Sequence, residues 1–258
     1  MQRRMRDEAG KTKPYHLPCA LRLDSRRGLC ARGLSALAVY IEFEPSEARY
    51  LEMAVSTLAD VNAYGDEGGK IYDYAFAESA EDLVSRSDCV VRVRVRPELD
   101  ILGRYILSAL DVVKTLSGNA PQSGTIFIYE PVLMAEEPIW REQFPDLIGP
   151  LWLDGAANRL RPGDEYVVAL KRVELAEGAL SPEHEGRLYI YTDMLCSAFP
   201  CGKEPEYYKY ASDDWDDDNP VRYKDVYDAD YIGSSSILGS CRFLYEKMTE
   251  YFGQEAFE

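Results

Sequence analysis

The chain has 258 residues and a mass of 29.2 kDa, with 46% hydrophobic residues, which is enough to bury a sizeable core without disulfide or metal staples. The formal net charge is −16, and the acidic excess lies in residues 46–258, where forty aspartates and glutamates stand against twenty lysines and arginines. Such a body repels phosphate groups, which excludes nucleic acid as an expected partner and favours cations or basic proteins. No run approaches the roughly 20 apolar residues of a transmembrane helix.

Residues 1–45 are basic, with nine lysines and arginines against five acidic residues, and are interrupted by Pro14 and Pro18. They are predicted to be disordered or poorly packed, or a segment that processing removes. The apolar run Gly33–Ile41 follows Arg32 in the order of an export signal, and an ordinary buried strand explains the same run. The sequence therefore leaves the compartment open.

Residues 46–258 are predicted to form one domain flanked by helices. Apolar residues recur at helical spacing from Ser46 to about Ala63 and predict an N-terminal helix. A short helix is expected to start at Ser79, and a longer one is predicted over 235–252. The apolar stripe of that C-terminal helix consists of Ile237, Cys241, Leu244, Met248 and Tyr251.

Between these helices the hydrophobic period changes to two, which is typical of strands with one buried face. The predicted strands are Cys89–Arg96, Tyr105–Leu116, Thr125–Glu130, Glu165–Glu174 and Arg187–Thr192. The fold class is therefore predicted as mainly β with flanking helices (α+β): a five-stranded OB-like closed barrel with a large insertion between strands at 131–160.

Four segments in this order carry a family resemblance: EDLVSRSDCVVRVRV, LSALDVVKTLSG, GTIFIYEP and LRPGDEYVVALK. They resemble a group of small, mostly uncharacterised bacterial proteins, often exported or lipid-anchored, whose OB-like barrel is similar to the netrin and metalloproteinase-inhibitor modules. The matching positions are Ser87-Asp88, Leu116-Ser117-Gly118 and Pro162-Gly163-Asp164. The resemblance implies the barrel, an extracytoplasmic location and a binding role, and it carries over no catalytic residue.

Three arginines, Arg92, Arg94 and Arg96, alternate with valines in the first predicted strand. Alternation turns the valines inward and the arginines outward. We expect the arginines to pair with carboxylates of neighbouring strands, and the alternative is a basic stripe that contacts an anion or an acidic partner. The carboxylates available for pairing are those of Asp111, Glu130 and Glu174.

The segment SDDWDDDNPVRYKD places Asp214, Asp216 and Asp218 at positions 1, 3 and 5 of a candidate calcium loop, with Asp225 at position 12. Alternate side chains of a tightly curled loop point to one centre, which gives calcium the oxygen ligands that it requires. Asn219-Pro220 replaces the glycine turn of a helix-loop-helix site. The segment predicts either a calcium site or a solvated acidic loop that attracts cations.

The 131–160 insertion carries Trp140, Phe144 and Trp152, which is more apolar surface than a passive connection needs. That surface either packs over the barrel or forms a docking patch for a partner.

Six cysteines include no CxxC pair, which argues against a structural zinc site. Cys196 and Cys201 would close a small disulfide loop in an exported protein. Cys89 and Cys241 occupy apolar positions in the periodic pattern of their segments, which is typical of buried, unpaired cysteines. His184 lies between glutamates in a loop that is predicted to be exposed.

Catalytic motifs such as a Gly-rich phosphate loop, HExxH or Gly-x-Ser-x-Gly do not occur in the sequence. The prediction is therefore a non-enzymatic protein that needs no cofactor other than a calcium ion and contacts a protein partner or a cation through its acidic surface and the 131–160 insertion. One alternative is a hydrolase in which two of Glu136, Glu137 and Asp154 converge in a cleft. The other is a purely structural surface protein.

Overall fold

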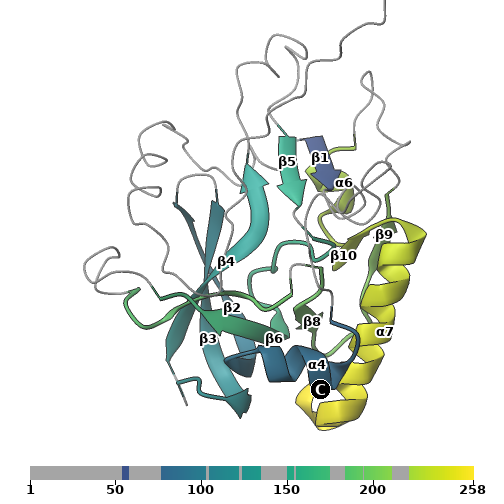
Figure 1. The fold of residues 1–258 in the computed structure, drawn as a ribbon. Helices are drawn as coiled ribbons and strands as arrows, with labels where there is room; N and C mark the ends of the chain where they lie inside the picture. The colour runs from purple at the N-terminus through teal and green to yellow at the C-terminus, as the bar shows by residue number, and fades with distance from the viewer. Residues whose placement is uncertain are drawn as a thin grey trace, which may run out of the picture.

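Five strands close into a barrel in the computed structural model, which describes residues 54–57, 77–102, 105–121, 124–134, 150–153, 155–174, 184–193, 195–210 and 221–258 (Figure 1). The barrel strands are β2 (Cys89–Leu102), β3 (Tyr105–Gly118), β4 (Thr125–Met134), β6 (Glu165–Arg172) and β7 (Leu188–Tyr191). Each coincides with one of the five predicted strands apart from its ends. The predicted fold class is therefore confirmed.

The barrel closes through one parallel pair. The strands follow one another in the order β4-β3-β2-β6-β7 with antiparallel neighbours, and β7 then pairs with β4 in parallel, so that Phe127 lies opposite Leu188. A closed ring of this kind leaves no free edge among its five members. A short strand, β8 (Ala198–Pro200), pairs with β6 outside the ring.

Alternation along β2 fills the barrel as the sequence predicts. Val91, Val93 and Val95 are buried, whereas Arg94 and Arg96 are exposed on the opposite face. At the end of this hairpin Gly118 lies opposite Cys89 with φ of +75°, a backbone conformation that favours glycine.

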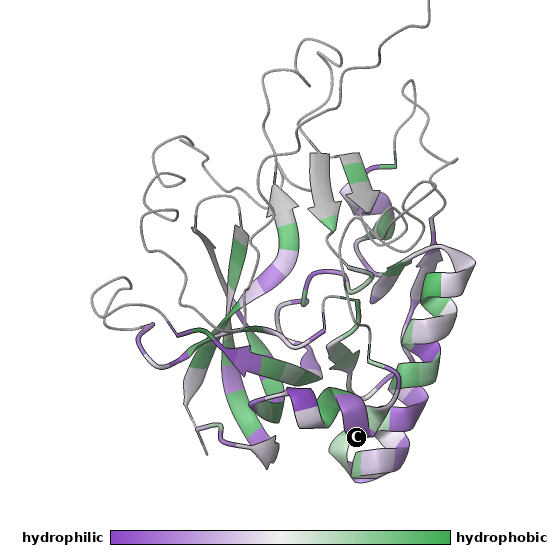
Figure 2. Cartoon of the chain, viewed as in Figure 1, coloured by the Kyte–Doolittle hydropathy of each residue, from purple (hydrophilic) through white to green (hydrophobic). Residues whose placement is uncertain are grey.

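Two helices pack against the main core. The helix α4 (Ala80–Arg86) begins where the Ser79 hydroxyl accepts from the Asp82 amide, and α7 (Ser235–Phe252) begins at Ser234 in the same manner. The predicted start of the short helix at Ser79 and the predicted C-terminal helix over 235–252 are thus confirmed. In Figure 1 α4 and the final turns of α7 lie side by side, and Figure 2 shows apolar and polar residues alternating along α7, as an amphipathic helix requires.

A second core lies where β4 runs beyond the barrel. There β5 (Pro150–Leu153) pairs with β4, and β1 (Ala54–Thr57) pairs with β5 in parallel. The elements α6 (Tyr223–Val226), β9 (Tyr207–Lys209) and β10 (Tyr231–Gly233) also contribute to this region, and the 3-10 helix η2 (Gln254–Ala256) follows α7. The side chains of this core are Val55, Ile106, Val132, Leu153, Tyr210, Tyr223, Val226, Ala229 and Ile232.

The predicted helix from Ser46 to Ala63 is wrong over Ala54–Thr57, which form β1. The rest of that prediction lies outside the described residues. The apolar residues around Val55 recur at helical spacing in the sequence, which is why a helix was predicted. In the structure Val55 is buried in a strand that pairs with Leu151, and local periodicity cannot predict a pairing with so distant a residue.

The described ends of the 131–160 insertion pack inside the protein. Leu153, Ala156 and Leu160 are each at most 1% exposed, so these parts pack rather than dock. Residues 135–149, which include Trp140 and Phe144, lie outside the described residues, as does the side chain of Trp152. No helix in the part of the chain that the structure describes is long and apolar enough to cross a membrane.

Candidate functional site

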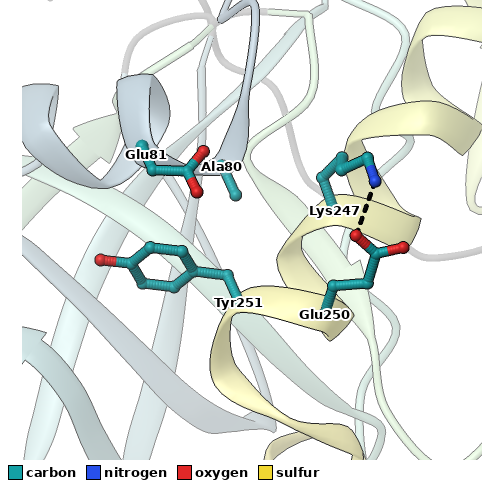
Figure 3. A pocket seen from close by; sticks show the side chains of 5 residues that line it. All are labelled: Ala80, Glu81, Lys247, Glu250 and Tyr251. Carbon is teal, nitrogen blue, oxygen red and sulfur yellow. Dashed lines mark hydrogen bonds and ion pairs between the residues drawn. The ribbon is translucent and has the colours of Figure 1, made fainter.

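A small groove lies between α4 and α7 on the described surface. It has a volume of about 150 Å³ and is lined by Ala80, Glu81, Lys247, Glu250 and Tyr251. Figure 3 shows the Tyr251 ring extending from α7 toward α4 near Glu81, while Lys247 and Glu250 pair on the α7 side. We call these five residues the α4–α7 groove.

Buried contacts fix both walls of the groove. On α4, Ala80 and Leu83 are at most 1% exposed and pack into the main core. On α7 the buried stripe continues through Leu244 and Met248. The groove therefore lies between two helices that the core holds in place.

Carboxylates dominate the charge of the groove. The Lys247 ammonium lies 2.6 Å from a Glu250 carboxylate oxygen, and this hydrogen bond is the main cause that raises the pKa of Lys247. Attraction to Glu246 and Glu81 raises the pKa of Lys247 further. One ammonium thus stands among three carboxylates, which leaves net negative charge at the groove.

Two exposed aromatic side chains lie on the outer side of α7 beside the groove. Phe243 is 48% exposed and Tyr251 is 47% exposed, and the Lys247 ammonium lies 5.8 Å from the centre of the Phe243 ring. Positions 243, 247 and 251 are four residues apart, so they follow one face of the helix. We call the groove together with Phe243 the α4–α7 face.

Tyr251 was predicted in the buried stripe of the C-terminal helix, and that prediction is wrong. Phe252 packs against the core in its place, because it follows Met248 by four residues. Tyr251 turns outward, with its ring edge-on to Phe252 at 4.9 Å between ring centres. The sequence pattern at the last turn of the helix fitted either residue.

A buried carboxylate, Asp193, holds the chain in front of α4. It accepts hydrogen bonds from the amides of Ala77 at 2.5 Å, Leu195 at 2.8 Å and Cys196 at 3.4 Å. It also lies 3.5 Å from the Arg86 guanidinium. One side chain, which no sequence motif singles out, therefore joins α4 to the segment that follows β7.

The three arginines of the β2 row pair with two carboxylates. Arg92 contacts Glu165 at 2.7 Å, Arg94 contacts the other oxygen of Glu165, and Arg96 lies 3.9 Å from Asp111. Burial acts to raise the pKa of Glu165, but the hydrogen bonds from Arg92 and Arg94 outweigh it and lower the pKa below its ordinary value. These contacts match the predicted structural role, with Glu165 as a partner that the prediction missed.

Glu130 was expected to pair with an arginine on the outer face, and this is wrong. It is 1% exposed, inside the barrel, where it accepts from the Ser108 hydroxyl and, at 2.7 Å, from the Leu160 amide. Alternation in β4 predicts this position, because Glu130 follows the buried Ile126 and Ile128 at steps of two. Burial raises the pKa of Glu130 despite its attraction to Arg159.

We expect Glu130→Gln to change how stability depends on pH. Because the pKa of Glu130 is raised in the folded protein, its favourable contribution is complete below the unfolded value of about 4.3 and is lost as pH rises through the folded value. The glutamine cannot ionise, so the variant should gain stability relative to the wild type as pH rises. Urea unfolding at a series of pH values measures the difference.

The matched control is Glu130→Leu. This variant leaves the Ser108 hydroxyl and the Leu160 amide without their acceptor, so it should be destabilised at every pH by about 1 to 3 kcal/mol. A constant difference between Glu130→Gln and the wild type across the pH series would contradict the inferred titration.

The candidate calcium ligands fall mostly outside the described residues. Asp214, Asp216 and Asp218 are not described, and Asp225 lies in α6, where its carboxylate accepts from the Arg222 amide at 3.3 Å. Within the described ranges, no group of three or more His, Cys, Asp or Glu side chains is placed to hold a metal ion. Glu136, Glu137 and Asp154, the predicted hydrolase carboxylates, also lie outside those ranges.

Two further predictions are corrected. His184 is 8% exposed rather than solvated, because its ring packs edge-on against Phe127 with 4.5 Å between ring centres. Cys196 and Cys201 form no disulfide loop, because both are free thiols. The four described cysteines, which include Cys89, are free thiols.

The described residues thus define a closed five-stranded barrel with an acidic and aromatic face formed by α4 and α7. In comparisons with known proteins, no family model matches the chain, and no curated protein matches it. The resemblance to the exported netrin-like group therefore stays a prediction.

Proposed function

We propose that this is a non-enzymatic binding protein whose partner is a protein that presents a basic side chain beside an apolar one. The contact surface is the α4–α7 face. The observation that carries the proposal is the position of Phe243 and Tyr251, which are two of the three large apolar side chains exposed in the described part of the chain, with Val113. Both side chains belong to α7, and both flank the acidic α4–α7 groove.

Charge favours a basic partner at this face. Lys247 neutralises only one of the three surrounding carboxylates, and the final turn of α7 has no basic side chain to balance the negative end of the helix dipole. A lysine or arginine of the partner would find uncompensated negative charge there. The acidic excess over 46–258 also speeds the approach of a basic protein.

The exposed aromatic ring adds a contact that charge alone does not give. Tyr251 presents a ring beside the carboxylates of Glu81 and Glu250, so a guanidinium in the groove would meet both an anion and a π face (Figure 3). Tyrosine is enriched among residues that dominate binding energy at interfaces. Tyr251 is therefore expected to be the main anchor.

The remaining functional predictions stay open. The middle of the 131–160 insertion and the acidic loop at 211–220 lie outside the described residues, so a second contact region and a calcium ion remain predictions. The same holds for the hydrolase alternative, and a purely structural role predicts that no peptide binds the α4–α7 face.

A selection experiment tests the proposal without a known partner. A random peptide library is displayed and enriched on the full chain, and the enriched peptides are sequenced. We expect lysine or arginine next to aromatic or large aliphatic residues. We also expect Tyr251→Ala to weaken their binding by about tenfold, with a steep loss of affinity at high salt.

Two matched variants control for nonspecific effects. Val113→Ala shortens another exposed apolar side chain, and Glu185→Gln removes an exposed charge away from α7, so both should bind the peptides as the wild type does. Glu81→Gln should weaken binding. Enriched peptides that bind Tyr251→Ala and the wild type equally, or a library that yields no binder, would contradict the proposal.

A further inference from the structure

The α4–α7 face already holds one basic side chain, that of Lys247. Its ammonium lies 2.6 Å from a Glu250 carboxylate oxygen and 5.8 Å from the centre of the Phe243 ring. A carboxylate and an aromatic ring are two groups that attract a cation at a protein surface. Lys247 therefore makes within the chain the kind of contact that the proposed partner would make with its own lysine or arginine.

The helix brings these groups together without any partner. Phe243 and Lys247 are four residues apart on α7, and Lys247 and Glu250 are three apart, which are the spacings at which side chains meet on one helix face. Glu81 lines the same groove from α4, and Figure 3 shows the Tyr251 ring extending toward it. The chain's own cation thus lies among the side chains that a basic partner would contact.

The contact between Lys247 and Glu250 is open enough to be displaced. The Lys247 side chain is 40% exposed and that of Glu250 is 65% exposed. Ion pairs this open to water contribute little, because water and salt screen them. A guanidinium binds a carboxylate through two parallel hydrogen bonds, whereas the Lys247 ammonium donates to one oxygen of Glu250. An arginine of the partner is therefore well suited to replace Lys247 at this carboxylate.

We propose that Lys247 is a built-in competitor, which occupies the cation position of the α4–α7 groove until a basic side chain of the partner displaces it. This inference rests on the proposed function and adds how its affinity is limited. Displacement breaks the pair with Glu250, and the displaced ammonium then repels the entering cation. A partner that offers only one basic side chain therefore binds weakly, and the face favours partners that add an apolar contact.

The test compares the wild type with Lys247→Gln, which removes the competing charge and keeps a good helix former. The random peptide library is enriched on each of the two proteins, and the enriched peptides are titrated into both at low salt. We expect Lys247→Gln to bind the peptides about fivefold more tightly than the wild type does. The gain should shrink at high salt, which screens the competing charge.

Three variants show whether the gain arises at the groove. Lys114→Gln removes an exposed positive charge of β3, so it changes the net charge by the same amount and should bind as the wild type does. Lys247→Arg keeps the competing charge and should bind no more tightly than the wild type. Adding Tyr251→Ala to Lys247→Gln should abolish the gain, because it removes the ring that the peptides contact.

The outcomes separate this inference from the proposed function. If the peptides bind the wild type but bind Lys247→Gln no more tightly than Lys114→Gln, Lys247 is not a competitor, and the proposed function stands without it. A gain that persists after Tyr251→Ala would place the effect outside the groove and would also overturn the inference. If neither selection yields a peptide whose binding Tyr251→Ala weakens, the inference and the proposed function fail together.

Discussion

Replacing Gly118 with alanine is expected to destabilise the barrel by about 3 kcal/mol or more. Gly118 has φ of +75°, where a side chain is strained, and an added Cβ would overlap the Asp88 carbonyl oxygen and lie 2.8 Å from the Cys89 Cα atom. Both obstacles are backbone atoms at the end of the β2–β3 pairing, so they cannot rotate away. Urea unfolding monitored by tyrosine and tryptophan fluorescence measures the loss.

Gly163→Ala is the matched control for that variant. Gly163 also has a positive φ, of +89°, but nothing lies within 4 Å of its added Cβ. It therefore reports the conformational strain alone, at about 1 kcal/mol. If the two substitutions cost the same, the close approach of Gly118 to Asp88 would not contribute to stability.

The second large effect is expected for Asp193→Ala, at about 3 kcal/mol. The substitution leaves the amides of Ala77, Leu195 and Cys196 without an acceptor in a buried region. Because Ala77 lies two residues before Ser79, which caps α4, the helix should open more often, and hydrogen exchange measures this as faster exchange of its amides. Peptides that bind the α4–α7 face should also bind this variant more weakly.

Two substitutions separate the role of Asp193 from a general loss of charge. Asp193→Asn keeps one acceptor oxygen and turns the other position into a donor, so its cost should be intermediate. Asp82→Ala removes a partly exposed carboxylate that pairs with Arg86 at 3.1 Å, and should cost about 0.5 kcal/mol. Unchanged exchange of α4 in Asp193→Ala would show that the helix does not depend on this carboxylate.

The barrel could be predicted because its strands are short apolar segments, with alternation in β2 and β4, and turn residues separate them. Val91, Val93 and Val95 report one inward face, and the Pro162-Gly163-Asp164 turn marks where β6 begins. Closure was predicted from the number of strands and their turns, but the strand pair that closes the ring could not be, because the pairing of β4 with β7 joins segments far apart in sequence. The strand β1 was missed for the same reason, since only its pairing with β5 defines it.

The α4–α7 groove was not foreseen, because it depends on which residues of two distant helices come together. Glu81 and Tyr251 are ordinary surface residues in sequence, and the stripe pattern alone did not decide between Tyr251 and Phe252 for the inner position. Glu130 is different. Glu130 follows Ile126 and Ile128 at steps of two, so the alternation of β4 already places it on the inner face of the barrel. The expectation that it pairs with an outward arginine ignored this alternation.

The parallel closure of the barrel has a consequence for the order in which the protein is made. The strand β4 leaves the ribosome well before β7, so the nascent barrel keeps two strand edges open until Tyr191 has emerged. Pairings between segments so distant in sequence slow folding, and domains with such topology fold on the order of milliseconds to seconds. The open edges invite pairing with other chains in that interval. Synthesis must therefore pass the end of β7 before the barrel protects itself from aggregation.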